Sequence, residues 1–296
     1  MPSLIDLRRR IRSVKNTQQI TKAMKMRSAA RLRRAQERVI ASRPYALLMR
    51  QFLGRLVSRL EASGAAETTD AGVDVPLHPL LARRPAKRIL LLVMGGDKGL
   101  AGAFNANVHK AAAIFLQEHA GEQVDMIAIG RKPRDFFRRR RQLVGEFADL
   151  FAKVKYEDAR TIAAKVIQRY TAAECDEVYI IYNEFKSVLI QRLRIERLLP
   201  LDKPTDEASV QVDYIYEQPP AELLATLLPR YVEVQVFRSL LESSASEHAA
   251  RMTAMDAASK NAREMIDRLT LNMNRIRQAS ITREIIEIVS GAAALE

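Results

Sequence analysis

Hydrophobic residues at helical spacing mark two long stretches, one at each end of the chain. The first is predicted to run from about residue 3 to about residue 58. Its apolar positions fall at alternating steps of three and four residues, and they are Leu4, Leu7, Ile11, Val14, Leu32, Ala35 and Val39. Gln18 and Thr21 continue this register as polar residues, which either fix the alignment of paired helices or are tolerated imperfections of the seam. Ser3 followed by Asp6 is a variant of the capping box that begins a helix, and Pro44 indicates a bend or a join.

In the second stretch Pro229 either kinks the helix or begins it, and after Pro229 the chain has no further proline and a single glycine, Gly291. About sixty helical residues extend for about 90 Å, which is more than one globular domain of this size needs. One seam again alternates steps of three and four: Met252, Met255, Ser259, Ala262, Ile266, Leu269, Met273 and Ile276. This heptad repeat predicts a left-handed coiled coil, and the alternative is an amphipathic helix packed on a globular core.

The middle of the chain alternates short apolar runs with amphipathic stretches. Strands are predicted at residues 88–96, 124–130, 177–185, 188–196 and 210–217. Helices are predicted at residues 103–119 and 158–173. Apolar runs separated by helices indicate an α/β layer in which at least part of the sheet is parallel.

Together these elements predict an α+α/β fold. A long antiparallel coiled coil of the N- and C-terminal helices would carry an inserted α/β, Rossmann-like domain. The expected limits are residues 1–60 and 221–296 for the coiled-coil shaft, 61–86 for a connector and 87–220 for the inserted domain. The 296 residues, 48% of them hydrophobic, are enough to bury a core.

The net charge of +13 is unevenly distributed along the chain. Residues 1–43 hold thirteen lysines and arginines against Asp6 and Glu37, a net charge of +11. A basic helix indicates a nucleic acid, an acidic lipid or an acidic protein surface as partner. A second basic run, RKPRDFFRRRRQ at residues 131–142, could bind RNA or lipid headgroups, or could form a solvated helix face.

The sequence offers no persuasive catalytic or metal site, and we expect no cofactor. The segment LLVMGGDKGLAGAFN (91–105) lacks the Lys-Ser or Lys-Thr of a P-loop, and Asp97 replaces the middle glycine of the dinucleotide fingerprint. A tight strand-to-helix connection is therefore the preferred interpretation over a phosphate site. The four histidines are scattered, and Cys175 lacks a nucleophile signature and fits a reducing compartment. No apolar run approaches the length of a membrane span, and the start of the chain predicts no secretory signal.

Three stretches resemble the gamma subunit family of F-type ATP synthases. They are RRRIRSVKNTQQITKAMKM (8–26), GGDKGLAGAFN (95–105) and SEHAARMTAMDAASKNAREMIDRLTLNMNRIRQASITREIIEIVSGAAAL (246–295). The resemblance implies a non-catalytic rotor subunit that couples proton-driven rotation of a c ring to conformational change at catalytic sites in beta subunits. The implied partners are three alpha and three beta subunits, an epsilon subunit and the c-subunit ring. Nucleic acid is not among them, and contact with the membrane is expected only through the complex, on the cytoplasmic face of a bacterial inner membrane.

The resemblance also implies roles for individual residues. Coupling and partner contacts are expected at Arg8, Arg9, Arg12, Lys22, Met24, Lys25, Arg251, Gln278 and Thr282. An apolar tip that turns inside a sleeve of neighbouring subunits is expected at Ile285, Ile288, Val289, Ala292 and Leu295, because hydrophobic contact is non-directional. The alternative for the tip is permanent docking on the chain's own α/β core. For the whole chain, the alternatives are a nucleic-acid-binding basic coiled-coil protein and a nucleotide-binding α/β enzyme.

Overall fold

The computed structural model describes residues 3–62, 78–201 and 218–293. Its two longest elements are helices α1 (Leu4–Ala62) and α5 (Pro220–Ala293), which confirms a long helix at each end. The chain divides into two compact units, one made of Met1–Ala30 with Arg251–Glu296 and the other of Arg31–Ala250. The expected domain limits at residues 60, 86 and 220 stay a prediction.

Prolines do not interrupt either long helix. Pro44 lies inside α1, so the chain has no join there. Helix α5 begins at Pro220, next to the expected start of the C-terminal shaft at residue 221, and it continues through Pro229, which therefore does not begin the helix. Pro220 stands in the first turn, where the missing N–H of proline costs no hydrogen bond.

The start of α1 has the capping box that the sequence predicts. The backbone N–H of Asp6 donates to Ser3 Oγ over 3.2 Å, and the backbone N–H of Ser3 donates to Asp6 Oδ2 over 3.3 Å. Ser3 Oγ also donates to Asp6 Oδ2 over 2.7 Å. These bonds satisfy donors that the first helical turn leaves unpaired.

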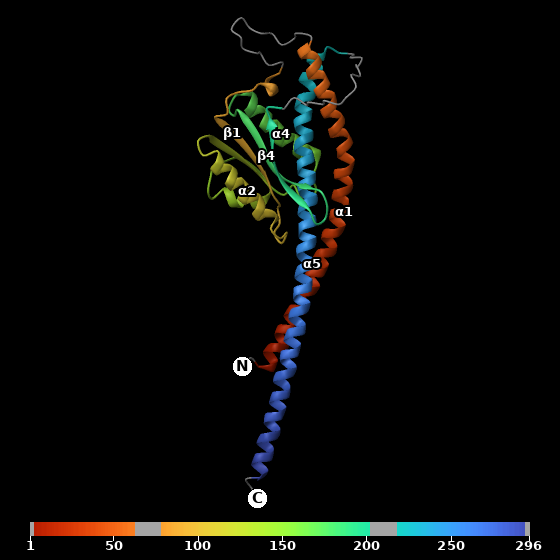
Figure 1. Ribbon diagram of the computed structural model, residues 1–296, viewed down its shortest axis with the longest axis vertical. Helices are drawn as coiled ribbons and strands as arrows, with labels where there is room; N and C mark the ends of the chain where they lie inside the picture. Colours follow the sequence, from red (N-terminus) through yellow and green to blue (C-terminus); the bar gives the residue numbers. More distant parts are fainter. Residues whose placement is uncertain (1–2, 63–77, 202–217, 294–296) are drawn as a thin grey trace. The chain divides into compact units, whose positions relative to one another are not determined.

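The second unit contains one five-stranded sheet in the order β3-β2-β1-β4-β5 (Figure 1). Its strands are β1 (Arg88–Met94), β2 (Gln123–Ile129), β3 (Leu143–Phe147), β4 (Glu177–Phe185) and β5 (Gln191–Leu199). The first four strands are parallel and β5 pairs antiparallel with β4, so the mixed sheet is confirmed. The predicted strand at 188–196 begins three residues late, because residues 186–190 turn between β4 and β5. Strand β3 was not predicted, and the strand predicted at 210–217 lies outside the described residues.

Helices cover both faces of this sheet. They are α2 (Phe104–Glu118), α3 (Arg131–Phe137) and α4 (Tyr156–Thr171), with a short 3₁₀ turn η1 (Pro79–Leu81) before β1. The chain moves outward from β1 through β2 to β3 and then returns to β4 on the other side of β1. The crossover from β1 to β2 contains α2, and the crossover from β3 to β4 contains α4 and runs in the opposite direction across the sheet. Because both crossovers are right-handed, α2 and α4 lie on opposite faces. Both faces of β1 are therefore buried, which explains its uninterrupted apolar sequence RILLLVM.

The core between the sheet and α2 is built from alternate strand residues. Ile89, Leu91 and Val93 of β1 pack with Val108 and Phe115 of α2, and all five are buried. Phe137 at the end of α3 joins the same cluster. This core holds the ends of the parallel strands, and the loops that follow them, in fixed positions.

Within the second unit, α5 is buried on every side over residues 239–249, although this stretch is rich in serine and glutamate. Ser246 Oγ donates to the backbone carbonyl of Asn183 over 3.0 Å. The backbone N–H of Phe185 donates to Glu242 Oε2 over 3.3 Å, and Arg238 Nε donates to Glu242 Oε1 over 3.3 Å. Burial raises the pKa of Glu242 despite the opposing effect of Arg238. Directional hydrogen bonds therefore attach this part of α5 to strand β4.

Within the described ranges, no helix has both the length and the apolar content needed to cross a membrane.

Candidate functional site

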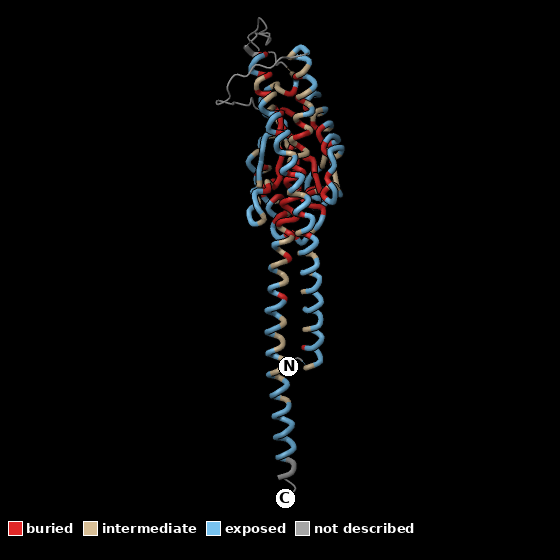
Figure 2. The backbone as a smooth tube through the Cα atoms, turned by 90° about the vertical axis from the view of Figure 1, so that its right-hand side faces the viewer, coloured by how far each residue is buried: buried red, intermediate tan, exposed pale blue. Residues whose placement is uncertain are grey.

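The first unit is a pair of antiparallel helices. Thr21 Oγ1 lies 2.7 Å from Ser259 Oγ, and Lys25 Nζ lies 2.6 Å from Asp256 Oδ1. As the residue number rises in α1 it falls in α5, which is the signature of antiparallel pairing. Figure 2 shows these two stretches running side by side.

The predicted seam of α5 forms the inner face of this pair. All eight seam residues from Met252 to Ile276 are buried or half-buried, whereas most residues between them are exposed. Met255 and Ala262 are only 5% and 8% exposed. On α1, Leu7 is buried and Leu4, Ile11 and Val14 are half-buried. The two helices therefore bury the heptad positions against each other, as a coiled coil requires.

A polar layer interrupts the seam. Gln18 and Thr21 are half-buried, and the hydroxyl of Thr21 meets that of Ser259. Next to it, Asp256 accepts from Lys25, and Lys260 Nζ lies 3.3 Å from Asp256 Oδ2. Hydrogen bonds from Lys25 and Lys260 lower the pKa of Asp256. Such a layer is satisfied in one alignment of the helices and therefore selects that register.

The predicted contact residues differ in exposure. Those that are exposed are Arg8, Arg9, Arg12, Lys22, Gln278 and Thr282. Met24 and Lys25 are half-buried, and Arg251 is only 7% exposed. The hydroxyl of Thr282 donates to the carbonyl of Gln278 one turn earlier, over 3.0 Å. Sequence reasoning did not find Asp256 as the partner of Lys25, because the two are 231 positions apart.

The apolar end of α5 is exposed. The register that joins Thr21 to Ser259 places Leu4 near Ile276, so no described residue of α1 lies opposite the following turns. Residues 281–290 are all exposed, and Ile288 is 72% exposed (Figure 2). The exposed apolar side chains here are Ile281, Ile285, Ile286, Ile288 and Val289. The side chain of Ala292 and all of Leu295 lie outside the described residues. An exposed apolar surface of this kind indicates an interaction site.

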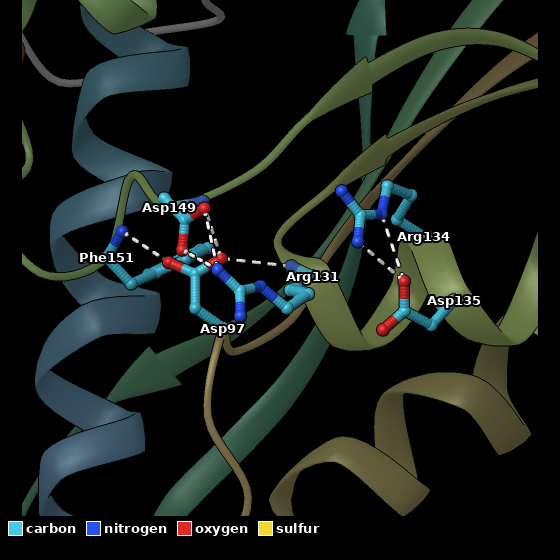
Figure 3. Close-up of polar contacts among 6 residues, drawn as sticks. All are labelled: Asp97, Arg131, Arg134, Asp135, Asp149 and Phe151. Carbon is cyan, nitrogen blue, oxygen red and sulfur yellow. Dashed lines mark hydrogen bonds and ion pairs between the residues drawn. The ribbon is translucent and has the colours of Figure 1, made fainter.

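The glycine-rich turn after β1 is organised around the carboxylate of Asp97 (Figure 3). Its Oδ1 accepts from the backbone N–H groups of Arg131 and Asp149, over 2.9 and 2.8 Å. Its Oδ2 accepts from the N–H of Phe151 over 3.0 Å. Asp97 is only 8% exposed, and Arg131 forms an ion pair with Asp149 at 2.6 Å. The carboxylate therefore ties together the loops that follow β1, β2 and β3.

Several other polar groups of the same turn are also paired within the chain. The N–H of Gly96 donates to Asn105 Oδ1 over 2.9 Å, and the N–H of Lys132 donates to the carbonyl of Gly96 over 3.0 Å. Gly130 has φ +103°, and a Cβ there would lie 2.0 Å from the carbonyl oxygen of Gly95, so only glycine fits. The backbone N–H groups of Gly95 and Gly96 are thus bonded within the chain, to the carbonyl of Ile129 and to the Asn105 side chain, and are not free to cradle a phosphate. This supports the interpretation of a tight structural connection.

Known proteins with similar sequences match this chain over essentially its whole length. A family model described as ATP synthase matches residues 3–295. The ATP synthase gamma chain of Solibacter usitatus (strain Ellin6076) is 60% identical over 297 residues, and that of Pelotomaculum thermopropionicum is 50% identical over 298 residues. Both alignments cover 100% of this chain and 100% of the relative.

Solved structures support the fold. The central stalk and c-ring structure of Tetrahymena thermophila mitochondrial ATP synthase matches with a TM-score of 0.60 and 24% identity, over 81% of this chain and 99% of that chain. The rotor of Euglena gracilis mitochondrial ATP synthase matches with a TM-score of 0.60 and 16% identity, over 94% of this chain and 98% of that chain. At these sequence identities the solved structures support the fold alone. The family of the chain is established by its full-length sequence identity to the gamma chains. The chain belongs to the ATP synthase gamma chain family.

Proposed function

We propose that this chain is the central rotor subunit of a proton-translocating F-type ATP synthase. The observation that carries the proposal is the continuation of α5 beyond the described part of its partner helix, with five exposed aliphatic side chains, in a chain that matches gamma chains over its full length. A surface of five exposed branched aliphatic side chains is costly in water and requires a partner. A ring of surrounding subunits supplies such a partner.

In this role the chain performs no chemistry itself. Three alpha and three beta subunits surround the shaft, ATP is made or hydrolysed in the beta subunits, and the second unit meets the epsilon subunit and the c ring. Each beta subunit contacts a different side of the helix pair. Rotation changes which beta conformation makes the favourable contacts, and this difference in free energy shifts the nucleotide affinity of each site.

The two kinds of surface on the first unit suit two kinds of contact. Exposed Arg8, Arg9, Arg12 and Lys22 carry charge that complements acidic loops on the beta subunits. The apolar tip offers non-directional contact, which holds the shaft in the centre without fixing its angle. Gln278 and Thr282, at the base of the tip, are exposed polar groups that can form transient hydrogen bonds during rotation.

The complex is expected at the cytoplasmic face of a bacterial inner membrane. Affinity purification of the tagged chain from native membranes should recover alpha and beta subunits in a three-to-three-to-one ratio with it. The alternative, a nucleic-acid-binding basic coiled-coil protein, finds no support among the comparisons. Recovery of ribosomes or DNA in place of alpha and beta subunits would nevertheless favour it and overturn the proposal.

A further inference from the structure

The basic run at residues 131–142 has no role in the shaft and forms a separate surface on the second unit. It contains seven lysines and arginines and one acid, Asp135. Its residues span α3 and the turn that connects α3 to β3, at the edge of the sheet opposite β5. We call Lys132, Arg139, Arg140 and Arg141 the basic corner, and all four are exposed.

The acids near this run are bonded to other cations. Asp135 pairs with Arg134 at 2.8 Å, Asp149 pairs with Arg131, and Glu146 lies 3.8 Å from Arg138. Among the described residues, no carboxylate forms an ion pair with any member of the basic corner. The four positive charges of the basic corner are therefore not neutralised by ion pairs with carboxylates of the described residues.

One arginine of the corner is held in a fixed orientation. The guanidinium carbon of Arg140 lies 3.9 Å from the centre of the Phe136 ring, and the other face of that ring stacks on His109 at 4.3 Å. Arg140 Nη1 also donates to the carbonyl of Phe136 over 2.8 Å. Burial, with Arg140 and Lys132 nearby, lowers the pKa of His109, so the stack keeps a neutral imidazole. Arg140 has thus already lost its rotamer freedom, and its remaining N–H donors are available to an anion.

The surroundings of the corner favour an extended anionic surface as its ligand. Phe136 is covered on both faces and Phe137 is buried, so neither ring can stack on a nucleobase. The apolar anchor that protein interfaces place at their centre is likewise missing from the corner's own four residues. Clustered cations without aromatic or apolar anchors are typical of peripheral binding to anionic lipid.

We infer that the basic corner binds the phosphate headgroups of an anionic phospholipid membrane. This rests on the proposed function, which places the second unit near the membrane, and it adds a direct lipid contact to the expected contact through the complex. Lipid headgroups diffuse in the plane of the membrane and impose no fixed angle, so the contact is compatible with rotation. Binding is electrostatic and weakens as salt screens the charges.

Flotation of the full-length chain with lipid vesicles tests this inference. The test variant carries Lys132→Gln, Arg139→Gln and Arg141→Gln, which leaves the Arg140 stack and every hydrogen bond described above intact. The control removes the same charge from exposed positions of α1 through Arg27→Gln, Arg31→Gln and Arg34→Gln. The vesicles contain phosphatidylcholine alone or phosphatidylcholine mixed with phosphatidylglycerol, and circular dichroism verifies that each variant is folded.

The chain should bind only the vesicles with phosphatidylglycerol, and the test variant should bind them roughly a hundredfold more weakly. The α1 control should retain binding, and the charge-conserving double variant Arg139→Lys with Arg141→Lys should retain most of it. Equal loss in the test and control variants, or no binding by the unmodified chain, would overturn the inference. Tighter binding to an RNA oligonucleotide that depends on the same three residues would also overturn it. Recovery of alpha and beta subunits with the test variant shows separately whether the proposed rotor function holds.

Discussion

Replacing Asp97 with alanine should destabilise the second unit more than any other single change at the glycine-rich turn. The substitution removes the acceptor of three backbone N–H groups, on Arg131, Asp149 and Phe151. A hydrogen bond to a charged acceptor contributes about 1.5–3 kcal/mol, and water can replace part of that near the surface. We therefore expect a loss of about 3–5 kcal/mol in the free energy of unfolding.

Two further variants separate the carboxylate from its surroundings. Asp97→Asn keeps one carbonyl oxygen as acceptor and should lose about half as much stability. Asp149→Asn removes the ion pair with Arg131 but leaves the Asp97 bonds in place, and asparagine tolerates the φ of +62° at this position. Because that pair is exposed, this variant should differ little from the parent chain.

Urea unfolding of the full-length chain, followed by circular dichroism, measures these differences through the midpoint of the transition. Acetate offers a second readout, since a small carboxylate can occupy the space left in Asp97→Gly and restore part of the lost stability. If Asp97→Ala and Asp149→Asn unfold at the same urea concentration, Asp97 does not hold the three loops together and the reasoning fails.

Four further outcomes follow from the helix pair. Thr21→Val and Ser259→Ala should each lower the melting temperature, and the double variant should recover it, with a coupling of about 0.5–1.5 kcal/mol in a double-mutant cycle. Because Lys25 and Lys260 lower the pKa of Asp256 below 3.8, this carboxylate stabilises the pair above that pH and stops doing so as pH falls through its folded pKa. Melting curves of the parent chain and Asp256→Asn should therefore differ at neutral pH and converge in acid. Met24→Lys should leave ATP hydrolysis by the assembled complex intact while proton pumping into membrane vesicles falls; undiminished pumping would count against the assigned contact. Deleting residues 288–296 should weaken assembly, measured by recovery of alpha and beta subunits, and a large loss of helical circular dichroism would contradict that expectation.

The elements with a strong apolar pattern could be predicted from sequence, and those without one could not. Strands β1, β2 and β4 each contain an apolar run of four or more residues, because their central residues are buried within the sheet. Strand β3 is short, includes Gly145, and lies at the edge of the sheet, so its sequence carries little signal. Helix α3 falls inside the basic run, which hides the buried Pro133 and Phe137. The sequence leaves open whether Pro229 kinks or begins α5, and the helix continues through it because packing within the second unit outweighs the hydrogen bond that this proline lacks.

In the candidate site, too, features with a local sequence pattern could be predicted and contacts between distant residues could not. The seam of α5 follows from residue spacing, and its burial agrees with that pattern, whereas an undocked apolar tip is implied mainly by the family resemblance. The bond between Lys25 and Asp256 joins opposite ends of the chain and has no local signal. Asp97 is visible in the sequence only as a break in a phosphate-binding fingerprint. Its role as an acceptor depends on three loops that only the folded sheet brings together.

Helix α5 changes its mode of attachment along its length, and this change is the physical basis of a rotor. In the second unit, Glu242 and Ser246 fasten it to strand β4 through directional bonds that fix one orientation. In the first unit, hydrophobic seam packing and one polar layer bind it to α1 in a single register. Over residues 281–290 every residue is exposed, and aliphatic side chains such as Ile285 and Ile288 alternate there with charged ones. Neighbours of these aliphatic side chains meet non-directional contact that does not fix the angle of the shaft, whereas the bonds in the second unit make α5 turn together with that unit.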